Sequence, residues 1–221
     1  MPGSEDETVP VWDLALRLGH WASAILVAAC YATSRLNWMG LHVWLGEALL
    51  ALVLFRLLWG IWGSENARLG VFLASPRAAL RHLGTLFLRE PDRFPGHNPA
   101  GGWMVVSLLA LLLGETLSGI YVNNDVANES GLTEYVPAVI ANAITDLHLL
   151  LWWALVAAIS LHLLAIAAYA ALKGQNLLRP MLTGRKCLPA AIPPPKLAPR
   201  RRAAALLALA IAAALALGQV L

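Results

Sequence analysis

Residues 144–164 read ITDLHLLLWWALVAAISLHLL, with two histidines, His148 and His162, and no charge after Asp146. About 20 apolar residues in a helix cross the hydrocarbon core of a bilayer. Ionisable side chains inside such a run are rare and mark functional sites. Fourteen residues turn a helix by about 1400°, close to four whole turns, so both imidazoles share a face about 21 Å apart along the axis. One metal ion cannot bind both, and we expect each to serve its own site at its own membrane depth.

Composition places the chain among integral membrane proteins. Of its 221 residues 59% are hydrophobic and only 13% are charged, against about 25% charged in soluble domains. The net charge of +3 comes mainly from arginines beside apolar segments, a pattern that predicts contact with lipid and not with nucleic acid. Cys30 and Cys187 lie on different segments and suggest neither a disulfide nor a zinc site. The acidic N-terminus lacks the positive region of a signal peptide, so we expect the first apolar segment to be retained.

Five apolar segments approach the length of a membrane span. We therefore predict an all-α membrane protein, a four-helix transmembrane bundle with a fifth, C-terminal transmembrane helix. The predicted division is a four-helix domain over residues 1–186, a Pro/Arg-rich linker over 187–202 and the extra helix over 203–221. The five predicted spans are residues 14–33, 41–62, 102–122, 146–172 and 203–221.

Basic residues are concentrated in two of the connections. The loop after the second span has five arginines, the segment after the fourth is also basic, and the loop after the third has neither Lys nor Arg. The positive-inside rule then places the N-terminus in the cytoplasm.

Two loops have features of their own. Ser75 followed by Pro76 predicts a helix start, and the leucines after it suit a helix lying on the cytoplasmic membrane surface. The outer loop, residues 123–137, is acidic. We favour a solvated loop there over a docking face for a basic partner.

The intramembrane histidines fall at two depths. His42 opens the second span and His148 the fourth, both at the outer side. His20 lies thirteen residues before the outer end of the first span, which places it about 20 Å deeper. His162 is about equally far down the fourth span. A single such histidine is more often a hydrogen-bonded packing residue, but four at paired depths favour two ligand pairs.

Two imidazoles on facing helices of a bundle can ligate one haem iron from both sides. Two pairs would hold two haems b, bound non-covalently because the chain has no CxxCH motif. The haem propionates need cations, and Arg17 and Arg56 lie toward the inner side; Glu115 is an alternative partner for Arg56. Of the other histidines, we expect His82 on the surface helix and His97 in a turn.

Several motifs resemble the bacterial cytochrome b561 family, especially the type that includes the b-subunits of nickel-iron hydrogenases. They are VWDLALRLGHW, RLLWGIWGSENARL, GHNPAGGWM and GQNLLRPMLTGRK, within about residues 11–186. The resemblance implies four helices with two haems b in the bacterial inner membrane, and it puts the ligand roles on His20, His42, His148 and His162. Leu149 follows His148 where the family often has Glu, which leaves a partner other than a hydrogenase open.

Our main interpretation is an electron-transfer subunit linking quinone with a periplasmic hydrogenase, c-type cytochrome or other redox protein. We expect the quinone near the inner haem, with Arg17, Arg56 and His97. The nearest variant is a stand-alone quinone-linked oxidoreductase of the superoxide-oxidising type. A histidine-lined metal or proton transporter would favour acidic neighbours and broken helices, but only Glu47 and Glu115 are candidates. A non-redox membrane anchor leaves the histidines unexplained, and the oligomeric state, including a homo-oligomer, stays open.

Overall fold

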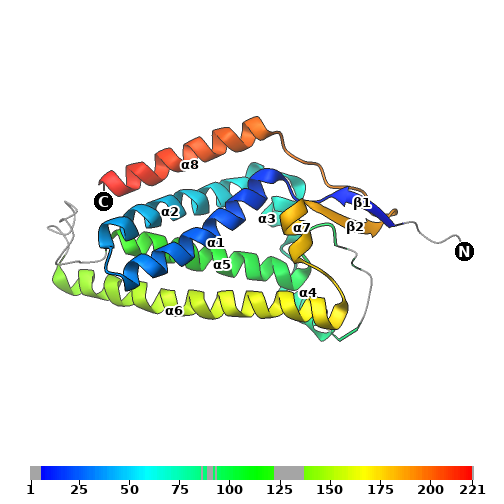
Figure 1. Ribbon diagram of the computed structural model, residues 1–221, viewed down its shortest axis with the longest axis horizontal. Coiled ribbons are helices and arrows are strands. Elements are labelled where there is room, and N and C mark those ends of the chain that lie inside the picture. The colour runs from blue at the N-terminus through cyan, green and yellow to red at the C-terminus, as the bar shows by residue number, and fades with distance from the viewer. Residues whose placement is uncertain (1–5, 86, 89–91, 93, 122–136, 221) are drawn as a thin grey trace, which may run out of the picture. The chain divides into compact units, whose positions relative to one another are not determined.

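The computed structural model describes residues 6–85, 87–88, 92, 94–121 and 137–220. Five long helices dominate this part of the chain, and each is long and apolar enough to cross a membrane (Figure 1). The prediction of an all-α membrane protein is confirmed. The five helices are α1 (Leu14–Arg35), α2 (Met39–Trp62), α5 (Pro99–Ile120), α6 (Ala138–Ala168) and α8 (Arg200–Val220).

Helix α6 begins eight residues earlier than the sequence analysis predicts. Its start follows Pro137, whose fixed φ suits the beginning of a helix. Asp146, taken as the start of the span, is an exposed residue within the helix. The 31 residues of α6 extend over about 46 Å. A π-helical turn η2 (Tyr169–Lys173) continues it and ends at Gly174, whose φ of 71° is left-handed.

Short helices make up the connections between the spans. The predicted helix start at Ser75 is confirmed, because its hydroxyl accepts a hydrogen bond from the Ala78 amide at 3.3 Å. Residues 123–136 of the acidic outer loop lie outside the described residues. The short helices are η1 (Glu65–Ala67), α3 (Leu69–Phe72), α4 (Pro76–Gly84) and α7 (Leu178–Thr183).

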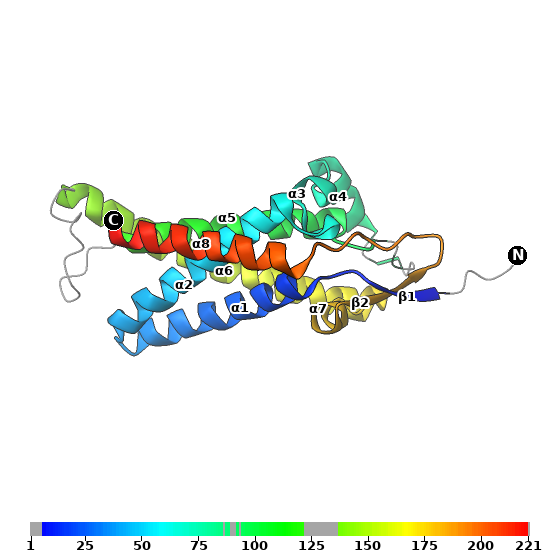
Figure 2. The ribbon, with the colours of Figure 1, turned by 90° about the horizontal axis from the view of Figure 1, so that it is seen from above.

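A two-stranded ribbon is the main feature that the sequence analysis did not predict. Strand β1 (Asp6–Pro10) pairs antiparallel with β2 (Arg185–Pro189) (Figure 2). Just beyond the ribbon, the amide of Val11 donates to the Gly184 carbonyl at 2.8 Å. The ribbon therefore holds the start of α1 beside the end of α7.

The chain divides into two compact units, and the division cuts across the long helices. Unit 1 contains Met1–Leu18, Leu58–Ser107 and Ala158–Ala203, and unit 2 contains Gly19–Leu57, Leu108–Ala157 and Ala204–Leu221.

Each unit has its own buried side chains. In unit 1 the indole of Trp59 is 1% exposed. In unit 2 the buried cluster is formed by Leu50, Ala51 and Ala214, so α8 packs against α2 there.

Candidate functional site

The structure places the four predicted histidine ligands on three helices. His20 is on α1, His42 is on α2, and His148 and His162 lie fourteen residues apart on the uninterrupted helix α6. That spacing corresponds to about 21 Å along the helix axis. His20, His42 and His148 belong to unit 2 and His162 to unit 1. The pairing of His20 with His162 therefore stays a prediction.

His42 is held by a hydrogen bond to the backbone of α1. Its Nδ1 lies 2.9 Å from the carbonyl oxygen of Cys30, which can only accept. Nδ1 must therefore carry the proton, and the lone pair of the neutral ring is on Nε2. The same carbonyl also accepts from the Thr33 hydroxyl at 3.0 Å, so the turn that receives the imidazole is itself fixed.

His148 is held in the same way by α5. Its Nδ1 lies 3.0 Å from the backbone carbonyl oxygen of Glu115 and 3.1 Å from the Ser118 hydroxyl. The carbonyl again requires Nδ1 to be the donor, which leaves the lone pair on Nε2. A histidine whose Nδ1–H bonds to a backbone carbonyl and whose Nε2 is available is the usual arrangement of a metal-ligating imidazole.

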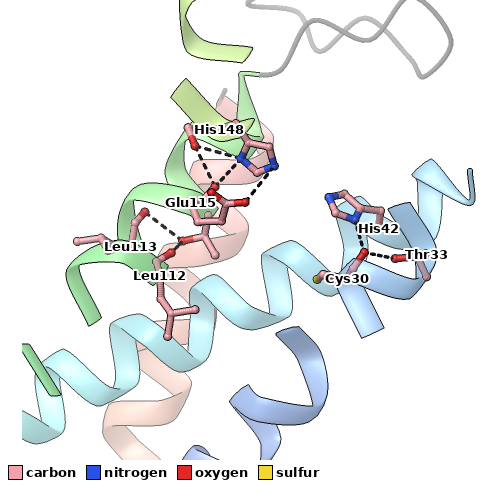
Figure 3. Close-up of polar contacts among 9 residues, drawn as sticks. Cys30, Thr33, His42, Leu112, Leu113, Glu115 and His148 are labelled. Atoms are coloured by element: carbon pink, nitrogen blue, oxygen red, sulfur yellow. Dashed lines mark hydrogen bonds and ion pairs between the residues drawn. The ribbon is translucent and has the colours of Figure 1, made fainter. Parts of the chain in front are cut away.

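The two imidazoles are turned toward one another. Figure 3 shows the ring of His148 reaching from α6 beside Glu115 of α5, and the ring of His42 on the opposite side, reaching from α2 beside Cys30 and Thr33 of α1. The structure thus brings the predicted outer pair together within unit 2.

Helix α5 supplies two supports for His148 that the sequence analysis missed. Ser118 is 7% exposed, and its hydroxyl contacts the imidazole. Gly119 leaves room for the ring, because a Cβ at this position would lie 3.1 Å from His148 Cε1. The only signal in the sequence was a small polar residue beside a glycine in an otherwise apolar span, which does not say which helix it faces.

Glu115 places a carboxyl group beside the same histidine. Its Oε1 lies 3.5 Å from Nε2 of His148. Its other oxygen, Oε2, is buried and has no hydrogen-bond partner in the part of the chain that the structure describes. The carboxyl group therefore lies next to the nitrogen that carries the lone pair of His148.

The predicted inner residues lie in different surroundings. His20 is exposed, and its ring meets the edge of Trp21 with centroids 5.2 Å apart. Arg56 is half-buried on α2. Arg17 donates from Nη1 to the carbonyl of Leu182, while its Nε is buried with no hydrogen-bond partner among the described residues.

The N-terminal motif VWD fixes the start of α1. Asp13 precedes the helix, and its Oδ1 accepts from the amide of Leu16 at 2.8 Å, as a helix-capping side chain does. Its Oδ2 accepts from the indole nitrogen of Trp59 at 3.0 Å. The ring of Trp12 packs against His97, with centroids 4.7 Å apart. His97 is thus half-buried against an aromatic ring and does not lie in an open turn.

His82, expected on the polar face of the surface helix, contacts aromatic rings. Its imidazole lies edge-on to Phe94 and stacked on Tyr169, with centroids 5.5 and 6.1 Å away. Its contacts tie α4 to the end of the fourth span within unit 1.

No group of three or more His, Cys, Asp or Glu side chains in the described ranges is arranged to hold a metal ion. The arrangement of His42 and His148 instead suits a metal whose remaining ligands come from a bound group.

Residues 11–184 match the family of prokaryotic cytochrome b561. A comparison with curated proteins found no match.

Proposed function

Because the chain belongs to the prokaryotic cytochrome b561 family, we propose that it is a dihaem cytochrome carrying electrons between a periplasmic redox partner and membrane quinone. Membership in this family implies a haem-binding helical bundle with b-type haem. The five helices of membrane length agree with a multi-pass membrane protein. The number of haems, their ligands, the partner and the quinone are what we propose beyond the family.

The observation that carries the proposal is the matched geometry of His42 and His148. Each donates Nδ1–H to a backbone carbonyl oxygen, which leaves Nε2 as the nitrogen that can ligate a metal. In His148 the Glu115 carboxyl lies 3.5 Å from this nitrogen and would have to move aside for a haem. A porphyrin supplies four nitrogen ligands to its iron, so two facing imidazoles complete the coordination. The hydrogen bonds at Nδ1 fix the ring orientation and raise the basicity of the ligating nitrogen. These residues fit an outer haem, which when bound supplies a one-electron carrier.

We propose His20 and His162 as the ligands of the inner haem. The support is the fourteen-residue spacing of the two histidines on α6, which sets two levels about 21 Å apart. Arg17 and Arg56 are the proposed cations for the haem propionates.

The domain division and the membrane orientation are also proposals. Residues 1–186 would form the haem domain, with 187–202 as linker and 203–221 as an extra helix. The arginine-rich loop between α2 and α5 supports a cytoplasmic N-terminus. Electrons from a periplasmic donor would then enter at the His42–His148 side. Quinone would be reduced on the inner side, where Arg56 and His97 give a polar edge for proton uptake.

One observation favours a second candidate, a proton carrier. An intramembrane carboxyl beside a histidine is typical of proton relays, and Glu115 contacts His148 in this way. The helices that bear these residues, however, are unbroken, whereas transporters often interrupt theirs at the binding site. An absorption spectrum of the purified protein separates the two candidates, because only the cytochrome has haem bands.

The deciding experiment measures haem content and its dependence on each histidine. A pyridine haemochrome assay should return two haems per chain, and none or one would refute the dihaem proposal. His42→Ala and His148→Ala should remove the same component in a redox titration. His82→Ala is the matched control, since its ring packs on aromatic side chains elsewhere and should leave both components in place. If His42→Ala and His148→Ala removed different components, the outer pairing would be wrong.

A further inference from the structure

A small pocket with a positive lining lies in unit 1, where α1 and α8 begin. Its volume is about 270 Å³, slightly below the range of about 300–1,000 Å³ for pockets that take drug-sized molecules. The site suits a small head group. Its charged lining residues are Arg17, Arg185, Arg200 and Asp13, and its aromatic ones are Trp12 and Trp59.

The charge of this lining is not balanced by its own residues. Three guanidinium groups and one carboxylate give a formal charge of +3 − 1 = +2. The carboxylate is already engaged, because Asp13 accepts from the Leu16 amide and the Trp59 indole. Arg17 uses Nη1 on a backbone carbonyl, and its buried Nε has no hydrogen-bond partner in the described ranges. A bound anion would balance the excess charge.

The backbone of Gly184 lies close against Arg17 at the wall of the pocket. Gly184 lines the pocket, and a Cβ on it would lie 3.0 Å from Arg17 Nε and 2.8 Å from the Trp12 carbonyl oxygen. Its φ of 79° also suits glycine. The close approach of backbone to guanidinium therefore depends on the missing side chain.

The place of the pocket along the helices indicates the source of the anion. Leu14 and Arg200 are the first residues of two helices of membrane length, so a pocket between these ends lies at the level of the lipid head groups. Indole rings favour the same level. Basic pockets between membrane helices on the cytoplasmic side bind anionic lipid head groups.

We propose that this pocket binds a phosphate group, and that its source is the head group of an anionic phospholipid. The guanidinium groups of Arg185 and Arg200 would contact the phosphate oxygens, and Arg17 adds its positive charge to the wall of the pocket. Arg185 and Arg200 have no part in the proposed haem sites, so the two proposals are tested by different variants. Free phosphate offers the same chemistry, and the experiment below distinguishes the two sources.

The test uses the purified, delipidated full chain with its haems in detergent. Native mass spectrometry measures binding of phosphatidylglycerol and, separately, of phosphatidylcholine. The second arm measures the melting temperature with and without millimolar inorganic phosphate. The variant Arg185→Gln/Arg200→Gln removes two pocket charges, and Arg179→Gln/Arg201→Gln removes two neighbouring charges that do not line the pocket. Haem absorbance, which should be equal in all proteins, checks folding.

The wild type should bind phosphatidylglycerol in preference to phosphatidylcholine. The pocket variant should bind phosphatidylglycerol at least about tenfold more weakly than the wild type, because it has lost charge-assisted hydrogen bonds. The control variant should bind it as tightly as the wild type. Stabilisation of the wild type but not of the pocket variant by inorganic phosphate, without lipid preference, would support the phosphate site and assign it to free phosphate. If the wild type shows neither effect, or if both double variants lose binding equally, the proposal is overturned.

Discussion

Substitution of Gly119 by alanine is a sensitive test of the outer site. The added Cβ would lie 3.1 Å from Cε1 of His148, whereas carbon atoms prefer about 3.5–4.0 Å. The imidazole must therefore move away from α5 by about 0.4 Å or more. Its hydrogen bonds to Glu115 and Ser118, now 3.0 and 3.1 Å, would lengthen to the limit of a hydrogen bond.

Two effects on stability should nearly cancel. Weakening a hydrogen bond costs about 0.5–1.5 kcal/mol, while replacing a glycine in the last turn of α5 by alanine gains at most about 0.5–1 kcal/mol. We therefore expect the melting temperature of Gly119→Ala to stay close to that of the wild type.

The electronic effect should be much clearer. A weaker hydrogen bond at Nδ1 makes Nε2 of His148 a poorer electron-pair donor to the iron. The reduced state of the iron is then favoured. If about 0.5–1.5 kcal/mol of the hydrogen bond is lost, the potential of the outer haem should rise by about 20–60 mV. A spectroelectrochemical titration resolves this shift from the inner component, which should stay unchanged.

The matched control is Gly46→Ala on α2, where an added Cβ meets nothing within 4 Å. It should leave both potentials unchanged. If Gly119→Ala gives the same titration curve as Gly46→Ala, His148 is not held against α5 as a haem ligand. A shift of the inner component alone would contradict the proposed role of His148 equally.

Three further predictions concern the pocket glycine, the C-terminal helix and the quinone site. Gly184→Ala forces a left-handed φ on alanine and sets its Cβ 2.8 Å from a backbone carbonyl oxygen, so thermal denaturation should show a loss of about 1–3 kcal/mol; Gly70→Ala, with nothing within 4 Å, should show none. A chain ending at Pro189 keeps both strands and all four proposed ligands and should retain its haem; haem loss from stably inserted protein would place α8 in the haem domain. His97→Ala and Arg56→Ala should lower quinone reduction per bound haem, with haem content measured in each variant, and full haem with full activity in both would move the quinone site elsewhere.

The membrane spans were predictable because a bilayer leaves the chain few choices. Backbone N–H and C=O groups that lie in hydrocarbon must form their hydrogen bonds within the same segment, so an apolar run of sufficient length forms a helix. The start of α6 was predicted wrongly, since the sequence analysis took Asp146 as a boundary. A single acidic residue near the water interface does not end a helix, and the alanine-rich segment before it continues the same hydrogen-bond pattern.

Other features could not be predicted from one sequence. DETVP and RKCLP each end in proline and do not alternate strictly, and their pairing joins residues nearly 180 positions apart. The supports of His148 were also missed, because the acceptor at Glu115 is a backbone carbonyl, which any residue type would provide. Tertiary packing decides which helix lies beside a given histidine. The position of that histidine along its own helix follows from its residue number alone.

The ribbon also constrains how the chain is threaded through the bilayer. Strands β1 and β2 can pair only if residues 6–10 and 185–189 emerge on the same face of the membrane. Among the described residues, the helices between them that are long enough to cross are α1, α2, α5 and α6, an even number, and α8 then returns the chain to the opposite face. A chain that failed to insert one of these four helices would leave its two strands on opposite faces. Because residues 185–189 follow all four helices in the chain, the ribbon can form only when an even number of these helices crosses the membrane.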